Sequence, residues 1–466
     1  MASDFSTPRR TVPFWKVMML GVCAMQIGPN LALSAGYQLH YSGLTSWLAL
    51  SGAALISMIV AVTLSRFARR YSVTASLLSF ARMSLSPLPV AVTAASFLLG
   101  YVIGPAVGVL SATIYLSSLL LTLGVPAGDA VMMQCAICVG ASIFIGACAY
   151  RGVDLSARVA MILGVACIPL AIWVTLAAGH SFAFDVRPEF NLHGETAISL
   201  ARGVFVGMAF FVGFDGVGAL ASETDDPHRS VPRILQWCVG IAGLTLAFGA
   251  LLQAPVLLAN AGALEAGQSP TKILADAGGM SSIALLSDLV LALAGIAGLI
   301  AWLNCAALIV ATAATEGFLP RALGRIHPSY GSPHQAVVFL SIVSIVLPVV
   351  LITWTRAAPI LATLYLTNID VLLWLVPYAI LCAGSWRLRD LDRRDGSYRA
   401  IALLGLFTIA AIVAAQVIWP IDHVAAVVNV AGAALIVGGS IVFFVLSPSR
   451  SIQPSESLPL TTKSSA

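Results

Sequence analysis

Long apolar stretches and short polar segments alternate along the whole chain. Most apolar stretches are about 20 residues long, which is the length of a helix that crosses a hydrocarbon core about 30 Å thick. Turn and charge signals divide them into twelve predicted membrane-spanning helices, of which the third and eighth are long enough to be strongly tilted or bent. These helices are expected near residues 14–37, 44–65, 88–122, 130–150, 156–179, 198–221, 235–259, 281–313, 335–355, 358–385, 399–419 and 424–446.

The composition indicates the same class of protein. Of the 466 residues, 59% are hydrophobic and only 9% are charged, and the mean hydropathy is +0.96. A soluble protein has about a quarter of its residues charged. The chain is therefore expected to be an all-α integral membrane protein. Its eight cysteines all lie in apolar runs, which is typical of small buried hydrophobic residues, so disulfides, a metal and a cofactor are not expected.

The basic residues predict the orientation in the membrane. Lys and Arg total 24, and 20 of them fall in segments that share one side of the membrane with the N-terminus. Because cytoplasmic loops carry the excess of Lys and Arg, both termini are expected in the cytoplasm. The same asymmetry explains the net charge of +4 without a nucleic-acid partner. The excess of arginine over lysine fits a GC-rich bacterial genome, so the expected lipid partner is a bacterial inner membrane.

The first predicted span is interrupted at its middle by Gly28-Pro29-Asn30. Proline removes a backbone donor and clashes with the preceding turn, glycine adds conformational freedom, and asparagine brings a polar side chain. A simple proline kink would explain this segment when it is taken alone.

The sixth predicted span carries a carboxylate, Asp215, between Gly213 and Gly216. A charge at the centre of a membrane helix costs roughly 2.5–3.5 kcal/mol on insertion scales, and the two glycines weaken the helix at the same place. Such a segment is tolerated where the freed backbone groups and the acid face a cavity instead of lipid. A structural acid held by backbone or hydroxyl groups is the alternative.

Two interrupted helices five spans apart predict a five-plus-five inverted repeat with helices 1 and 6 discontinuous. Each break exposes amide N–H groups that suit a carboxylate and carbonyls that suit an ammonium group. An amino acid or a related amine has this charge pattern. The expected divisions are a cytoplasmic segment 1–13, a first repeat 14–190, a second repeat 191–390, two further helices in 391–446 and a disordered cytoplasmic tail 447–466.

Three stretches resemble the amino acid–polyamine–organocation (APC) superfamily, and the resemblance covers nearly the whole chain. The stretch FFVGFDGVGALASETDDPHRSVPR, from Phe210, looks like the family's sixth helix and following loop, with an acid at Glu223 and D-P-x-R-x-x-P-R from Asp226. The stretch TEGFLPRALGRIHPSYGSPHQAVV, from Thr315, is similar to the loop after the eighth helix, and Met25–Asn30 falls at the family's I-G-x-G break. The resemblance implies a LeuT-like fold and a secondary transporter of the bacterial amino acid permease type.

The chain departs from the family pattern at two positions. Asn30 replaces the usual second glycine of the first helix, so the carboxylate pocket is expected to have a different shape. Cys167 stands at the best-aligned position of a lysine that some proton-coupled members have in the fifth helix. Asp370, midway along the tenth span, and Asp288, toward the outer end of the eighth, are therefore weighed beside Asp215 as carriers of a coupling proton. Each could equally be an acid that locks two helices together.

The substrate is expected between the two breaks, near the middle of the membrane. The residues expected to bind it are Ile27, Gly28, Pro29, Asn30, Phe211, Val212, Gly213, Asp215, Gly216 and Asn304. The candidates for coupling and gating are Asp215, Asp370, Asp288, Phe211 and Trp302.

The function predicted from these features is secondary active transport of an amino acid or related amine by alternating access, with a proton as the potential coupling ion. An exchanger or facilitator without proton coupling is the alternative within transport, and a substrate-sensing membrane receptor is the alternative outside it. The sequence contains neither a phosphate-binding glycine loop nor a constellation of catalytic nucleophile and base, so ATP-driven transport and enzymatic activity are not expected.

Overall fold

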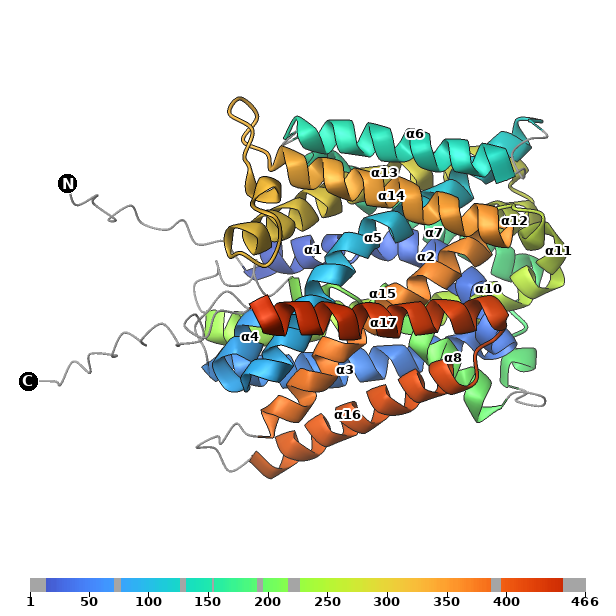
Figure 1. Ribbon diagram of the computed structural model, residues 1–466. Coiled ribbons are helices and arrows are strands. Elements are labelled where there is room, and N and C mark those ends of the chain that lie inside the picture. Colours follow the sequence, from blue (N-terminus) through green and yellow to red (C-terminus); the bar gives the residue numbers. More distant parts are fainter. Residues whose placement is uncertain are drawn as a thin grey trace, which may run out of the picture.

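The computed structural model describes residues 14–70, 77–125, 131–152, 155–190, 196–216, 227–386 and 395–446, and every regular element within these ranges is a helix (Figure 1). The helices of the first half are α1 (Phe14–Ala24), α2 (Ile27–Ser42), α3 (Ser46–Arg70), α4 (Leu77–Ser84), α5 (Pro87–Thr122), α6 (Val131–Tyr150) and α7 (Leu155–Ser181). Those of the second half are α8 (Ala197–Gly207), α10 (Pro227–Ala259), α11 (Ala261–Glu265), α12 (Pro270–Ala277), α13 (Ser281–Thr315), α14 (His334–Thr355), α15 (Pro359–Ser385), α16 (Asp395–Ile418) and α17 (His423–Leu446).

The long helices are apolar enough to cross a membrane. Among the described residues there are 11 candidate spans, and one of them, Ile27–Arg69, covers both α2 and α3. The total of twelve helices stays a prediction. The two longest helices are the expected third and eighth spans, with 36 residues in α5 and 35 in α13. Helix α5 crosses the bundle obliquely and continues through Pro105 without ending (Figure 1).

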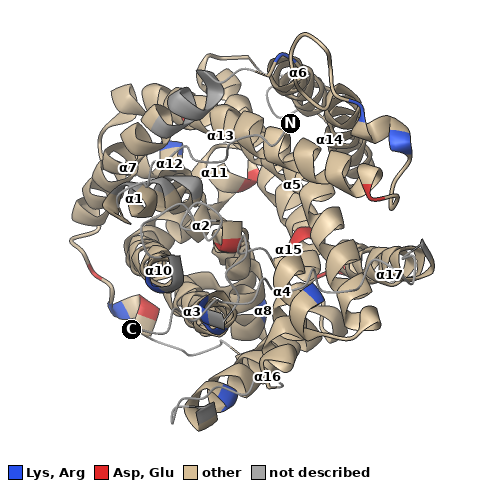
Figure 2. Ribbon diagram, turned by 90° about the vertical axis from the view of Figure 1, so that its left-hand side faces the viewer, with Lys and Arg blue, Asp and Glu red and all other residues tan. Residues whose placement is uncertain are grey.

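The helices form a ring around a few central elements. Seen along the bundle, α2 and α15 lie near the middle, whereas α6, α14, α16 and α17 lie at the periphery (Figure 2). Helix α3 packs along α10, and α5 packs against both α13 and α15. The second span therefore contacts the seventh and the third contacts the eighth, as an inverted repeat of five would produce. The symmetry axis itself stays a prediction.

Three short helices, α4, α11 and α12, were not predicted from the sequence. Helix α12 begins at a capping serine, Ser269, whose hydroxyl accepts the backbone N–H of Lys272 at 3.0 Å. The side chains of Ser269 and Thr271 also donate to Asp288 on α13, and Ser118 on α5 donates to the second oxygen of the same carboxyl group. Asp288 therefore joins α12, α13 and α5.

A buried acid lies in the short 3-10 helix η3 (Arg187–Phe190), in the segment between α7 and α8. The Glu189 side chain is fully buried, and within the described part of the chain neither of its carboxyl oxygens has a hydrogen-bond partner. The Trp47 indole donates to the Glu189 carbonyl at 3.2 Å and packs against Phe190, which holds the segment on α3. Burial raises the pKa of Glu189 from 4.5 to about 8.

This acid predicts a pH-dependent stability. Since the folded pKa lies above the unfolded one, the stability that protonated Glu189 contributes is fully present below pH 4.5 and is lost as the pH rises through about 8. We expect Glu189→Gln to melt like the wild type at pH 5 and at a higher temperature than the wild type at pH 8.5. Thermal melting in detergent tests this, with Glu265→Gln at an exposed site as control. Parallel pH curves for wild type and Glu189→Gln would contradict it.

Candidate functional site

The first membrane span is divided between α1 and α2, and the division lies at Met25–Gln26. Gln26 has a left-handed backbone, with φ 48° and ψ 45°. The break therefore falls two residues before the predicted Gly28-Pro29-Asn30, which forms the first turn of α2 instead.

The position of Pro29 explains this shift. In a continuous helix the proline ring would clash with the carbonyl of the residue four positions earlier, which is Met25. In the first helical turn proline is accommodated, because the N–H it lacks would have no partner within the helix. The Met25 carbonyl that the break frees accepts a hydrogen bond from the Asn30 side-chain amide at 2.8 Å. The Asn30 side chain therefore supplies the hydrogen bond that the Met25 carbonyl loses at the break.

The sixth span loses its regular helix at Gly207, where α8 ends. A 3-10 turn, η4 (Met208–Phe210), follows, and a second, η5 (Phe214–Gly216), comes after Gly213. Gly213 has φ +82°, a conformation that residues with a side chain rarely adopt, and a Cβ here would stand 3.2 Å from the Trp302 ring. The predicted interruption is therefore present, and it begins earlier than the glycines.

A cavity of about 190 Å³ lies between the two interruptions, and we name it the central cavity. Five of the residues predicted to bind or gate line it: Pro29, Asn30, Val212, Trp302 and Asp370. The other residues that line it lie at the first break and on α2, α5, η4 and α13: Met25, Gln26, Leu33, Gly104, Val107, Gly108, Ser111, Ala112, Tyr115, Ala209, Phe210, Leu291, Gly295 and Leu299. The space at the paired breaks is thus open to a small solute.

A second cavity, of about 390 Å³, contains Asp215 and Gly216, and we name it the Asp215 cavity. The Tyr378 hydroxyl on α15 donates to Asp215 at 3.0 Å. The cavity extends to Arg82 and Glu316, which form an ion pair of 2.9 Å between α4 and the end of α13. Asp215 is therefore separated from Asp370, a second acid predicted for coupling, which lines the central cavity.

Three aromatic rings stand between the two cavities. Tyr101 on α5 lines the Asp215 cavity and stacks on Trp302 of α13, which lines the central cavity, with 5.3 Å between ring centroids and 21° between planes. Trp374 on α15 packs edge-on against Tyr101 at 5.2 Å. We name these three residues the aromatic partition. Glycines of α5 make room for it, because a Cβ at Gly104 would lie 2.8 Å from the Trp302 indole nitrogen.

The remaining predicted binding residues line neither cavity. Phe211 is fully buried, and its neighbour Phe210 lines the central cavity in its place and packs on Tyr37 at 5.5 Å. Ile27 is buried, and Asn304 lies on α13 outside both linings.

Gly28 faces α7. A Cβ on Gly28 would stand 2.8 Å from the Cβ of Cys167 and 3.0 Å from the backbone nitrogen of Ile168. Gly28 therefore allows α2 and α7 to pack closely against each other. Asp288, the third acid predicted for coupling, also lines neither cavity, and its carboxyl group is bound by the hydroxyls described above.

Sequence reasoning missed Tyr378, the hydrogen-bond donor to Asp215, and several residues that line the central cavity, of which Tyr115 matters most. Tyr378 follows Asp370 by eight residues on α15, a spacing that places two side chains on neighbouring parts of one helix face. This spacing in the sequence could have indicated that Tyr378 faces the interior of the bundle. Tyr115 and Ser111 lie on the same face of α5 as Gly104 and Gly108, whose regular spacing was visible in the sequence as a close-approach pattern.

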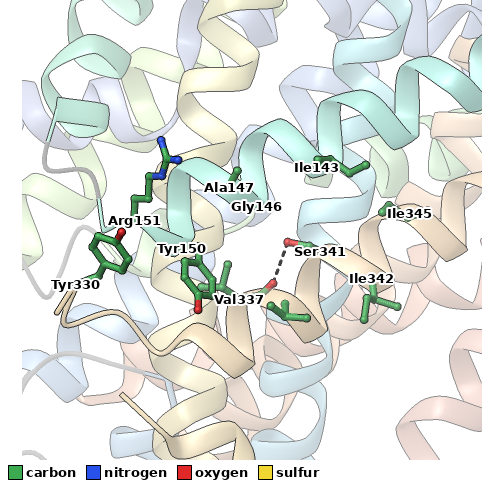
Figure 3. A pocket seen from close by; sticks show the side chains of 11 residues that line it. Ile143, Gly146, Ala147, Tyr150, Arg151, Tyr330, Val337, Ser341, Ile342 and Ile345 are labelled. Carbon is green, nitrogen blue, oxygen red and sulfur yellow. Dashed lines mark hydrogen bonds between the residues drawn. The ribbon is translucent and has the colours of Figure 1, made fainter. Parts of the chain in front are cut away.

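A cavity larger than these two lies elsewhere and faces outward. It measures about 530 Å³ and lies between α6 and α14, where Ile143 and Ile342 are more than half exposed (Figure 3). Tyr150, Arg151 and Tyr330 lie at one end of it (Figure 3). Both helices are at the periphery of the bundle, so lipid would cover this groove. It is distinct from the central cavity.

Residues 217–226 of the sixth-span motif, including Glu223 and Asp226, lie outside the described residues, as do the terminal segments 1–13 and 447–466.

Comparison with known proteins identifies the class of the chain. A family model described as amino acid permease matches residues 13–454. A protein of Mycobacterium tuberculosis (strain H37Rv) described as an uncharacterized transporter is 24% identical over 332 residues, which are 70% of this chain and 71% of that protein. The low-affinity putrescine importer PlaP of Escherichia coli K12 is 25% identical over 248 residues, 52% of each chain.

Solved structures agree on the fold. MhsT in complex with L-phenylalanine matches with a TM-score of 0.51 and 13% identity, over 85% of this chain and 98% of that one. A manganese transporter of Eremococcus coleocola matches with a TM-score of 0.52 and 13% identity, over 96% and 98%. The expectation of a LeuT-like fold is confirmed.

Proposed function

Because the chain belongs to the amino acid permease family of the APC superfamily and is a multi-pass membrane transporter, we propose that it moves an amino acid or a related amine across a bacterial inner membrane by alternating access. Both termini would face the cytoplasm, as the distribution of basic residues predicts.

The observation that carries this proposal is the central cavity between the two interrupted spans. Gln26 and Asn30 at one interruption and Phe210 and Val212 at the other all line it. Interrupted helices at such a position leave backbone polar groups without partners in the helix, and a polar solute can use these groups. The aromatic partition closes the cavity toward the Asp215 cavity, and alternating access requires such a barrier on each side of the substrate.

Uptake into proteoliposomes tests the proposal. Labelled amino acids and amines would be offered to the reconstituted protein with and without a pH gradient. We expect at least one of these solutes to enter faster than in protein-free liposomes, and unlabelled solute should compete with it. A panel of amino acids and amines that all enter at the protein-free rate would overturn the proposed function.

Proton coupling, where present, is assigned to Asp215. This acid lies in a cavity that extends to the end of the bundle, and Tyr378 is its hydrogen-bond donor, so both a path for a proton and a neighbouring hydroxyl are present. We expect Asp215→Asn to abolish the stimulation of uptake by a pH gradient while counterflow of preloaded solute persists. Asp276→Asn, at the ion pair with Lys272 on α12, is the control. Full gradient-driven uptake in Asp215→Asn would favour an exchanger or facilitator.

A further inference from the structure

The central cavity has an uneven balance of charge. Asp370 is the one charged side chain among the residues that line it, and none of those residues is Lys, Arg or His. The other polar side chains of its wall are Gln26, Asn30, Ser111, Tyr115 and Trp302. A substrate in this cavity therefore meets a carboxyl group without a protein cation to balance it.

Asp370 also has an incomplete set of partners in the protein, and the Trp374 indole is the donor that interacts with it. It is 9% exposed, and one of its carboxyl oxygens is buried with no hydrogen-bond partner in the described part of the chain. The other two membrane acids differ, since Asp215 accepts from Tyr378 and Asp288 accepts from three hydroxyls. A buried carboxyl oxygen without a donor is costly, so its persistence at a cavity wall indicates a donor that arrives from outside.

The hydroxyl of Tyr115, which can accept a hydrogen bond, is a further polar atom of the wall that is buried without a partner in the described part of the chain. The indole nitrogen of Trp302 is also unpaired there, but it is a donor and does not bind an ammonium group. The side chains of Asn30 and Ser111 already have partners in the protein, because the Asn30 amide is bound to the Met25 carbonyl and the Ser111 hydroxyl pairs with Tyr37 and with the Val107 carbonyl. An ammonium group carries three donors and no acceptor, which matches a free carboxylate, and an indole ring beside it adds attraction for a cation.

We propose that Asp370 is the binding residue for the substrate's ammonium group, and that the cargo is consequently a small organic amine with a net positive charge. This inference rests on the proposed function, and it narrows the cargo from amino acids and amines to amines. A free carboxylate on the substrate would lie in the same 190 Å³ as the Asp370 carboxylate, and like charges so close repel each other.

Matched pairs of ligands test the assignment directly. Each pair consists of an amino acid and its decarboxylation product: alanine with ethylamine, valine with isobutylamine, and lysine with 1,5-diaminopentane. Competition against the labelled solute in proteoliposomes, and thermal shift in detergent, would give the affinity of each compound. We expect the amine of each pair to bind at least about tenfold more tightly than its amino acid, a difference of about 1.4 kcal/mol.

Substitution of Asp370 tests whether this residue binds the ammonium group of the substrate. Asp370→Asn keeps the size of the side chain and removes its charge, and we expect it to weaken amine binding at least about tenfold and to remove the preference for the amine. Asp276→Asn, an acid on α12 outside the cavity, should leave both unchanged. The ligand comparison on wild-type protein stands by itself should Asp370→Asn fail to fold. Tighter binding of amino acids than of their amines would overturn this inference and leave the proposed function in place, whereas a panel without any bound or transported compound would overturn both.

Discussion

Gly295→Val is expected to abolish substrate binding while leaving the protein folded. Gly295 on α13 lines the central cavity, and a Cβ built on it would meet no atom within 4 Å. The valine side chain would therefore fill part of the central cavity, where the substrate is proposed to bind, without a steric clash with neighbouring residues. We expect uptake to fall at least about tenfold and ligand-induced thermal shifts to disappear.

A matched control separates cavity filling from the cost of valine in a helix. Gly140 on α6 is exposed at the periphery and likewise has no atom within 4 Å of an added Cβ, so Gly140→Val introduces the same side chain on the lipid side. It should transport like the wild type. Wild-type affinity in Gly295→Val would place the binding site outside the central cavity.

The glycines at the breaks are poorer sites for this experiment. Gly28→Val would push against Cys167 and the backbone of α7, and Gly213→Val would place a branched residue in a left-handed conformation against Trp302. Both variants are expected to lose stability, so a loss of transport in them would not report on binding. The sequence predicts that both glycines bind the substrate, and only the packing shows that the absence of their side chains allows close contacts between elements.

The membrane class, the LeuT-like fold and the presence of both interruptions could be predicted from the sequence. Hydropathy and span length depend on local composition, and glycine, proline and an acid within an apolar run are local signals. The exact position of the first break was missed by two residues, because it depends on where the Pro29 ring meets the carbonyl of Met25.

The side chains that face the cavity could be predicted only in part. Pro29, Asn30, Val212, Trp302 and Asp370, which the sequence analysis names as candidates for binding, gating or coupling, line it, but the rotation of the 3-10 turn η4 places Phe210 at the wall and buries Phe211 behind it. Periodicity does not fix such a rotation once a helix leaves its regular geometry. The separation of the membrane acids into two cavities and one hydroxyl cluster likewise depends on contacts between helices that are far apart in the sequence.

Trp302→Ala is expected to remove the barrier between the two cavities. Its ring stacks on Tyr101, lies 6.3 Å from Trp374 and covers Gly213, so three elements meet at this indole. Trp302 is half-buried, so its truncation should cost less than the roughly 3–5 kcal/mol typical of a fully buried aromatic residue, and the space it leaves would join the central cavity to the Asp215 cavity.

Accumulation of substrate against its gradient should therefore fall to below about a tenth of the wild-type level, because a solute that can pass the partition in either direction is not retained. Trp302→Phe keeps a ring that can stack on Tyr101 and should preserve most of the accumulation. Trp354→Ala removes an exposed indole near the end of α14 and controls for the loss of a tryptophan from the membrane surface. The measurements are steady-state accumulation in proteoliposomes and the melting temperature of each variant. Wild-type accumulation by a folded Trp302→Ala protein would show that the aromatic partition is packing alone and that the barrier to the substrate lies at another level of the bundle.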